Sequence, residues 1–211
     1  MIRFEYASDQ SLMVYLGDEI NLETHHRVLK LLRLIEAQPI PGVRNVHPAY
    51  NSMLLVFDPV DQEHSNIEHT LAAYIGQLDS IQLPPPRVVE IPVHYDGPDL
   101  EDVAALHHIT PRRVIELHSS AEYVAYFIGF VPGFAYLGGL PEELATPRLE
   151  KPRKRVPKGS VAIGGSHTGV YPFETPGGWR LIGRTPLEIF SPDRADLSVL
   201  RIGDLVRFRP L

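Results

Sequence analysis

The residues with the most potential for acid–base chemistry lie around position 118. His118 is followed by Ser119, Ser120 and Glu122. Imidazole changes its charge near neutral pH, and neighbouring hydroxyl and carboxylate groups could relay a proton to it. A histidine at the end of a predicted helix also stabilises the negative end of the helix dipole, and the spacing alone favours that structural role. Because the chain has no cysteine and no G-x-S-x-G motif, neither a thiolate nucleophile nor a Ser-His-Asp triad is predicted.

Three arginines could bind an anion. Arg184 follows a glycine in a predicted strand and turn, where its guanidinium could bind a carboxylate or phosphate through two parallel hydrogen bonds. It could equally be a surface arginine paired with an acidic residue. Arg153 and Arg155 lie in the basic run 151–158, which predicts an exposed loop that could contact phosphate. Neither G-x-x-x-x-G-K-[ST] nor G-x-G-x-x-G occurs, so any ATP site is atypical or shared between subunits.

Aromatic residues and glycines alternate through the same part of the chain. Glycine allows a close backbone approach, and aromatic side chains beside it could form the wall of an apolar pocket around a compact ring. The alternative is that the aromatic residues fill the core, as large aromatic side chains usually do. We favour the pocket. Its predicted wall consists of Phe130, Phe134, Tyr136, Tyr171 and Trp179.

The elements that precede this region predict a small α+β domain. Asn21 is a suitable N-cap for a helix that ends near Ala37, and Ser65 with Glu68 forms a capping box for a second helix. Apolar runs around the two helices predict the strands of an antiparallel sheet, closed by a strand at 88–93. This order of elements is typical of a ferredoxin-like α+β domain.

A run of three prolines at 84–86 predicts the domain boundary, because it forms a stiff, extended linker. The predicted domains are therefore 1–83 and 84–211. In the second domain, Asp99 and Thr110 are expected to cap two short helices, and the apolar runs that follow alternate with glycine and proline turns, as in a β-barrel. The predicted barrel strands are Val124–Ile128, Val161–Ile163, Arg180–Ile182, Leu187–Phe190 and Leu205–Phe208.

Composition narrows the function further. The chain has 211 residues, 44% of them hydrophobic, and a net charge of -6, which disfavours binding to nucleic acid or to an anionic membrane. No apolar run reaches the ~18 residues of a membrane span, and we expect a cytoplasmic protein. The pairs His25-His26 and His107-His108 lie on predicted helices and point about 100° apart, so we predict no protein-bound metal.

Glycine-rich and proline-rich motifs carry a family resemblance. They are His118-Ser119-Ser120, Gly129-Phe130-x-Pro132-Gly133-Phe134-x-Tyr136-Leu137, Pro157-x-Gly159-Ser160-Val161, Gly164-Gly165-x-x-Thr168-Gly169-Val170-Tyr171-Pro172, Thr175-Pro176-Gly177-Gly178-Trp179 and Ile182-Gly183-Arg184-Thr185. In this order they resemble the KipI / allophanate-hydrolase-subunit-1 family, and within it the 5-oxoprolinase type. The likeness is strongest over Glu116–Phe190.

The resemblance implies a cyclophilin-like C-terminal barrel and a role in a hetero-complex. The implied partners are a large homologous subunit of the KipA / allophanate-hydrolase-subunit-2 type and a third subunit. Together they would open the lactam of 5-oxo-L-proline to L-glutamate with hydrolysis of ATP, which brings Mg²⁺, and this chain alone would be inactive. Other family members inhibit a sporulation histidine kinase or belong to allophanate hydrolase and urea carboxylase, and a barrel of this kind could in principle isomerise prolyl peptides.

The resemblance also implies which residues form the site. It makes His118 and Arg184 the catalytic candidates, with Arg153 and Arg155 as phosphate contacts. The candidate substrate-binding residues are Phe130, Pro132, Gly133, Phe134, Tyr136, Gly164, Gly165, Thr168, Tyr171, Pro176, Gly177, Gly178, Trp179 and Thr185.

Overall fold

The proline run lies where the chain passes from one unit to the next. The structure, a computed structural model, describes residues 1–211. Residues Met1–Pro85 form the first unit and Pro86–Leu211 the second, each with most of its contacts within itself. None of the helices is both long and apolar enough to cross a membrane.

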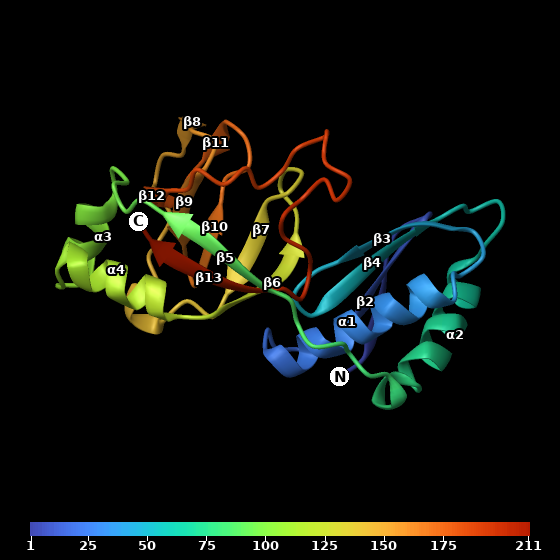
Figure 1. Ribbon diagram of the computed structural model, residues 1–211. Helices are drawn as coiled ribbons and strands as arrows, with labels where there is room; N and C mark the ends of the chain where they lie inside the picture. The colour runs from blue at the N-terminus through green and yellow to red at the C-terminus, as the bar shows by residue number, and fades with distance from the viewer. The chain divides into compact units, whose positions relative to one another are not determined.

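The first unit is a four-stranded antiparallel sheet with two helices on one face (Figure 1). Its strands are β1 (Arg3–Ser8), β2 (Ser11–Tyr15), β3 (Val43–Pro48) and β4 (Ser52–Phe57), in the order β1-β2-β4-β3. Its helices are α1 (Leu22–Ala37) and α2 (His64–Ile75), followed by the 3-10 turn η1 (Leu78–Ser80). Alternate residues of β2 and β4 are buried against apolar residues of both helices, as period-two strands require. An antiparallel sheet with two helices is confirmed.

The predicted start of α1 is confirmed, whereas that of α2 is wrong. The side-chain oxygen of Asn21 accepts a hydrogen bond of 2.8 Å from the backbone N–H of Thr24. In α2 the N-cap is Glu63, which makes no side-chain cap, and Ser65 lies inside the first turn. The capping box therefore does not form, because the helix starts before the serine that was expected to precede it.

The strand at 88–93 does not close the sheet of the first unit. It is β5 (Val88–Val93), and it pairs in parallel with β13 (Leu205–Pro210) in the second unit. Parallel strands need a long connection between them, and here nearly the whole second unit lies between the two. The ferredoxin-like expectation that included this strand is corrected accordingly.

A seven-stranded sheet forms the second unit, with the order β12-β9-β10-β7-β6-β13-β5. Its other strands are β6 (Tyr123–Ile128), β7 (Ala135–Gly138), β9 (Ser160–Gly164), β10 (His167–Val170) and β12 (Arg180–Arg184). The two edge strands meet at a bridge between His94 and Arg184, whose backbone groups exchange hydrogen bonds of 2.9 and 2.8 Å. The sheet is therefore a nearly closed barrel.

Two short helices cover the second unit at one side (Figure 1). They are α3 (Leu100–Leu106) and α4 (Pro111–Ser120), and Thr110 caps α4 as predicted by accepting a hydrogen bond of 3.2 Å from Arg113 N–H. The remaining elements are the 3-10 turn η2 (Glu142–Leu144) and the small sheet of β8 (Arg153–Val156) with β11 (Thr175–Gly177). Leu187–Phe190 is not a strand, since only Phe190 makes an isolated bridge.

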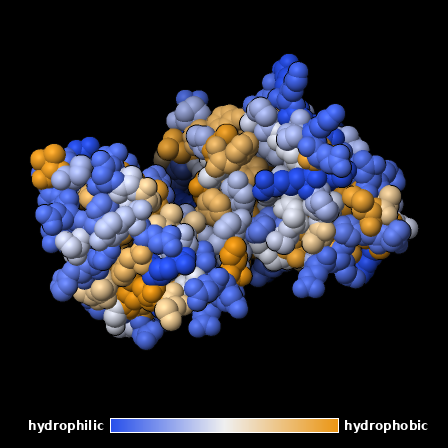
Figure 2. All heavy atoms as spheres, turned by 180° about the vertical axis from the view of Figure 1, so that it is seen from behind, coloured by the Kyte–Doolittle hydropathy of each residue, from blue (hydrophilic) through white to orange (hydrophobic).

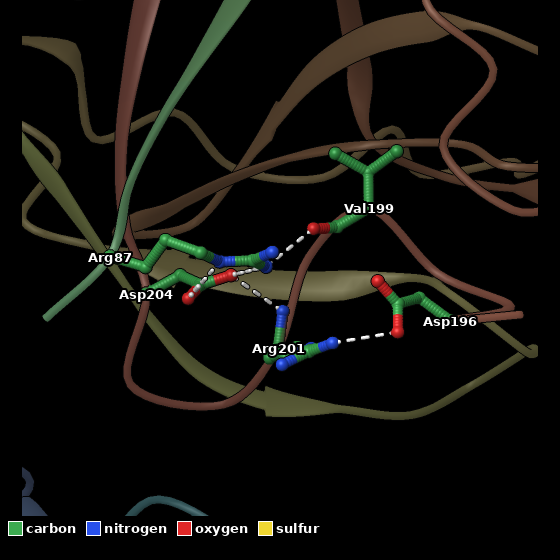
Figure 3. A network of polar contacts seen from close by, with 5 residues as sticks. All are labelled: Arg87, Asp196, Val199, Arg201 and Asp204. Carbon is green, nitrogen blue, oxygen red and sulfur yellow. Dashed lines mark hydrogen bonds and ion pairs between the residues drawn. The ribbon is translucent and has the colours of Figure 1, made fainter.

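An ion pair between exposed Arg87 and buried Asp204 joins the residues just before β5 and β13, the first and last strands of this unit (Figure 3). Arg87 donates hydrogen bonds of 3.1 and 2.6 Å to the two carboxylate oxygens of Asp204 and one of 2.7 Å to the carbonyl of Val199. The same carboxylate accepts a bond of 2.8 Å from the backbone N–H of Arg201. A buried carboxylate needs this number of donors, and together they fix the turn that leads into β13.

Candidate functional site

His118 lies in the centre of the second unit and has no exposed surface. Its Nε2 is 2.8 Å from the hydroxyl of Thr168 on β10, and its Nδ1 is 2.8 Å from the hydroxyl of Tyr95. The ring also packs on Phe208 and Tyr123. The predicted residue thus sits in the core between α4 and the sheet.

The hydrogen bonds determine the protonation state of His118. The single hydroxyl proton of Thr168 is donated to the carbonyl of Ala162 at 2.9 Å, so Thr168 accepts the Nε2–H of His118. Nδ1 then accepts from Tyr95, whose pKa is raised by burial. Burial lowers the pKa of His118 to about 3. The histidine is therefore neutral at physiological pH and has no unused hydrogen-bonding atom.

The predicted aromatic residues do come together. They form a cluster on the face of β7, β9, β10 and β12 that is turned away from the main core, with β8 packed against it. Phe134 lies 5.3 Å from Trp179, 5.2 Å from Tyr171 and 5.1 Å from Tyr136, measured between ring centroids. Phe134, Tyr171 and Trp179 are buried, Tyr136 is half-buried and Phe130 is exposed. Three of the rings therefore form a small core, and two lie at its surface.

Glycines make room for these rings. A Cβ atom on Gly164 would lie 2.5 Å from the indole of Trp179, and one on Gly177 would lie 2.4 Å from the hydroxyl of Tyr171. At Gly165, which has a φ of +63°, a Cβ atom would meet nothing within 4 Å. The glycine motif thus serves ring packing at two positions and borders open space at a third.

The three candidate arginines all have carboxylate partners. Arg184 Nε is 2.8 Å from Asp96, and Arg155 is 2.7 Å from Glu174. Arg153 is 2.6 Å from Asp99, whose carboxylate is 4% exposed and also accepts a bond of 2.6 Å from Leu181 N–H. Arg153 and Arg155 lie on β8 beside the aromatic cluster, whereas Arg184 lies at the barrel closure.

The other predicted residues have separate places. Gly133 adopts a φ of +81° in the turn after β6, against the side chain of Phe190. Thr185 is buried and accepts a bond of 3.1 Å from Leu187 N–H. Pro132 and Pro176 are exposed, and Gly178 lies beside Pro152. Thr168 contacts His118 on the core side of β10, so it does not share the aromatic face.

Sequence reasoning missed two side chains at the aromatic cluster. The guanidinium of Arg148 lies 5.9 Å from the centroid of the Trp179 ring. Burial, and then the charge of Arg148, lower the pKa of half-buried His167. The sequence holds no signal for this placement of Arg148, because nothing in its spacing relates it to the aromatic residues. No group of three or more His, Asp or Glu side chains is arranged to hold a metal.

Comparison with known proteins identifies the family of this chain. The family model described as "Carboxyltransferase domain, subdomain C and D" matches residues 2–200. The chain belongs to this family. Among carboxyltransferase C/D proteins it is 39% identical to a protein of Bacillus subtilis (strain 168) that is named as a subunit of 5-oxoprolinase, covering 98% of this chain and 91% of that protein. It is 42% identical to the 5-oxoprolinase subunit of the same name from Escherichia coli O157:H7, covering 96% and 93% of the two.

A solved structure agrees with the fold of this carboxyltransferase C/D chain. The crystal structure of TTHA0988 matches with a TM-score of 0.86 at 36% identity. The match covers 96% of this chain but only 39% of that one, so the chain spans well under half of the solved protein. The resemblance indicated by the glycine and proline motifs is confirmed.

Proposed function

We propose that this chain is one subunit of a heteromeric, ATP-dependent 5-oxoprolinase that opens 5-oxo-L-proline to L-glutamate. The observation that carries the proposal is the likeness to two proteins that are named as subunits of 5-oxoprolinase, which extends over nearly the full length of both partners in each comparison. A match of this extent includes both units, not only the aromatic motifs.

The aromatic cluster is the proposed substrate-binding part of this chain. A five-membered lactam is compact and planar enough to lie against an aromatic surface, and the half-buried Tyr136 and exposed Phe130 supply such a surface over a rigid base of buried rings. The open space at Gly165 adjoins the same strands. The glycine-rich turns allow the backbone to approach the ligand closely.

Arg184 is the proposed catalytic cation, and His118 a positioning residue. Arg184 has 68% of its side chain exposed, so it can exchange Asp96 for a partner or substrate group that gains negative charge during the reaction. His118 is enclosed and neutral, and both its nitrogens are engaged. Within this proposal it holds Thr168 and β10 in place behind the aromatic face and does not touch the substrate.

The residues of this chain do not by themselves fit ATP. Its proposed phosphate contacts, Arg153 and Arg155, are paired with Asp99 and Glu174, and no glycine-rich phosphate loop precedes a helix. We therefore assign ATP and its Mg²⁺ to the assembled complex. The proposed partners are the large subunit of the KipA / allophanate-hydrolase-subunit-2 type and a third 5-oxoprolinase subunit.

Glutamate release from 5-oxo-L-proline and ATP tests the proposal. The chain is co-expressed with the two proposed subunits, and each subunit is omitted in turn. We expect activity only from the complete mixture, and a loss of about 100-fold in Arg184→Ala, the loss typical of removing one catalytic group. Arg112→Ala is the control, because Arg112 is an exposed residue on α4 whose partner is Glu116. A complete, folded mixture without activity would exclude the function.

Two alternatives have a specific observation in their favour. The carboxyltransferase name of the matched family fits a subunit of the urea carboxylase or allophanate hydrolase type, and activity of the same mixture on urea or allophanate would support that alternative. Figure 2 shows hydrophobic atoms gathered between hydrophilic side chains, and Phe130 and Leu197 are among the exposed apolar residues. An exposed apolar surface suits a kinase inhibitor, which a kinase autophosphorylation assay would detect.

We also propose a ferredoxin-like fold for the first unit and a cyclophilin-like barrel for the second. The sheet order β1-β2-β4-β3 with two helices on one face supports a ferredoxin-like first unit, without the strand at 88–93. The closure between His94 and Arg184 supports a cyclophilin-like barrel for the second.

A further inference from the structure

One arginine of the second unit has no polar partner. Its other arginines all form an ion pair or donate a hydrogen bond, among them Arg87, Arg153, Arg184 and Arg194. Arg148 is exposed, and the contact that the structure gives its guanidinium is the face of Trp179 at 5.9 Å. At that distance, close to the limit for a cation–π interaction, the ring holds the cation only weakly. The five N–H donors of Arg148 are thus available to a ligand.

The backbone on both sides of Arg148 is fixed. Thr146 and Gly165 exchange hydrogen bonds of 3.1 and 2.8 Å, which tie the segment to the turn between β9 and β10. On the other side, Leu149 N–H donates a bond of 2.7 Å to the carbonyl of Gly178, next to Trp179. An ordered backbone that carries an unpaired cationic head lowers the entropy lost when that head binds a ligand.

The positive charge of Arg148 acts to lower the pKa values of the side chains around it. Burial raises the pKa of Tyr136, and Arg148 partly opposes that rise. Burial also raises the pKa of Tyr171, which a backbone hydrogen bond from Trp179 and then Arg148 oppose. Besides burial, Arg148 likewise lowers the pKa of His167, and Arg153 also acts on Tyr171, so an anion bound at this surface would meet the positive charge of Arg148.

We propose that Arg148 binds the carboxylate of a small cyclic substrate whose ring lies against the half-buried Tyr136, beside the buried Trp179, and that this contact selects anionic lactams over neutral ones. A guanidinium binds a carboxylate through two parallel hydrogen bonds, which fixes the orientation of the ring as well as its charge. The inference rests on the proposed function for the identity of the ring, whereas the carboxylate contact follows from Arg148 and its surroundings.

The test compares two ligands that differ only in the carboxylate: 5-oxo-L-proline and 2-pyrrolidinone. Trp179 is the single tryptophan of the chain, so its fluorescence reports binding next to Arg148 in the full chain. We expect Arg148→Gln to weaken the binding of 5-oxo-L-proline roughly tenfold or more, which is the loss expected for a charge-assisted hydrogen bond. The affinity for 2-pyrrolidinone should not change. Arg112→Gln is the matched control and should bind both ligands as the wild type does. Arg148→Lys keeps the positive charge but loses the two parallel donors of the guanidinium. Its affinity for 5-oxo-L-proline should lie between those of the wild type and Arg148→Gln.

Kinetics in the assembled complex supply the second measurement. Arg148→Gln should raise KM for 5-oxo-L-proline more than it lowers kcat, because the carboxylate does not react and its contact is made in the ground state as well as in the transition state. An unchanged affinity and KM in Arg148→Gln would overturn the inference, as would a wild-type chain that binds neither ligand or both equally well. If the wild type shows the Arg148-dependent preference but the complete complex releases no glutamate, the carboxylate site stands and the proposed reaction fails.

Discussion

The hydroxyl of Tyr95 donates a 2.8 Å hydrogen bond to Nδ1 of His118, a histidine with no exposed surface. This contact joins the segment after β5 to the last turn of α4. Through the other nitrogen it continues to Thr168 on β10. Three separate parts of the second unit are therefore connected through one neutral imidazole ring.

Tyr95→Phe should lower the free energy of unfolding of the second unit by about 1–3 kcal/mol, because it leaves a buried ring nitrogen without a donor. Denaturant titration of the full chain measures this change. Tyr74→Phe is the control, since the Tyr74 hydroxyl bonds an exposed site at the Gln38 carbonyl where water can replace it. Equal effects of the two substitutions would contradict the role given to the buried contact.

Stability should fall as the solution becomes acidic. Burial lowers the pKa of His118 to about 3 and that of His25 to about 4. Below the unfolded value near 6.5, the unfolded chain takes up protons that the folded chain does not bind. Each histidine should therefore remove about 1.4 kcal/mol of stability per pH unit, from about pH 6.5 down to its own folded pKa.

Denaturant titrations at a series of pH values check this dependence. His118→Gln should be less stable than the wild type at pH 7, yet its stability should decline with acid less steeply, by about one proton in the linkage slope. The wild-type slope retained in His118→Gln would show that another group controls the acid sensitivity.

Two arginines on β8 should differ in their effect on stability. Arg153 pairs with Asp99, a buried carboxylate, whereas Arg155 pairs with the exposed Glu174. Arg153→Met should lower the free energy of unfolding by about 3 kcal/mol, because it leaves the buried Asp99 carboxylate with one backbone donor. Arg155→Met should lower it by less than about 1 kcal/mol, because its ion pair is exposed. Thermal or denaturant unfolding of the two variants gives the comparison, and a similar cost for both would contradict it.

Gly164→Ala should disturb the aromatic cluster. Its new methyl group would lie 2.5 Å from the indole of Trp179, a ring held by Phe134 and Tyr136, so we expect a loss of about 1–3 kcal/mol and a shifted tryptophan emission. Gly76→Ala is the control: its Cβ would meet no atom closer than 3.6 Å, and its φ of -62° suits alanine. That variant should be neutral or slightly more stable. Unchanged emission in Gly164→Ala would mean that the ring has room to move.

Local signals in the sequence predicted the elements that depend on local contacts. Asn21 and Thr110 cap α1 and α4 because each cap is a bond to a backbone group three residues away. Asp99 failed as a predicted cap because its carboxylate bonds Leu181 and Arg153 instead, both distant along the chain. The same limit applies to β5, whose partner strand is settled only by the folded barrel.

The candidate site was predictable in its aromatic residues but not in its charges. Repeated glycines beside Phe134, Tyr171 and Trp179 are a feature of the sequence, and the structure gathers those rings. Which arginine has a carboxylate partner is a question of tertiary distance, and the residues chosen from spacing were paired ones. Arg148 has no carboxylate partner, and its place beside Trp179 depends on backbone hydrogen bonds of Thr146 and Leu149 to residues distant along the chain.

The parallel pairing of β5 with β13 has a consequence for synthesis on the ribosome. β5 is the first strand of the second unit, yet its partner β13 is synthesised after all the other strands. The two strands pair from Val88 with Leu205 to Val93 with Pro210. Until β13 emerges, the edge of β5 is unpaired and Asp204 is not available to Arg87. The first unit has all its strands and helices long before then and can fold while translation continues, whereas the second unit must complete its barrel in one late step. A nascent chain stalled shortly before residue 204 would thus display a folded first unit and an incomplete second one.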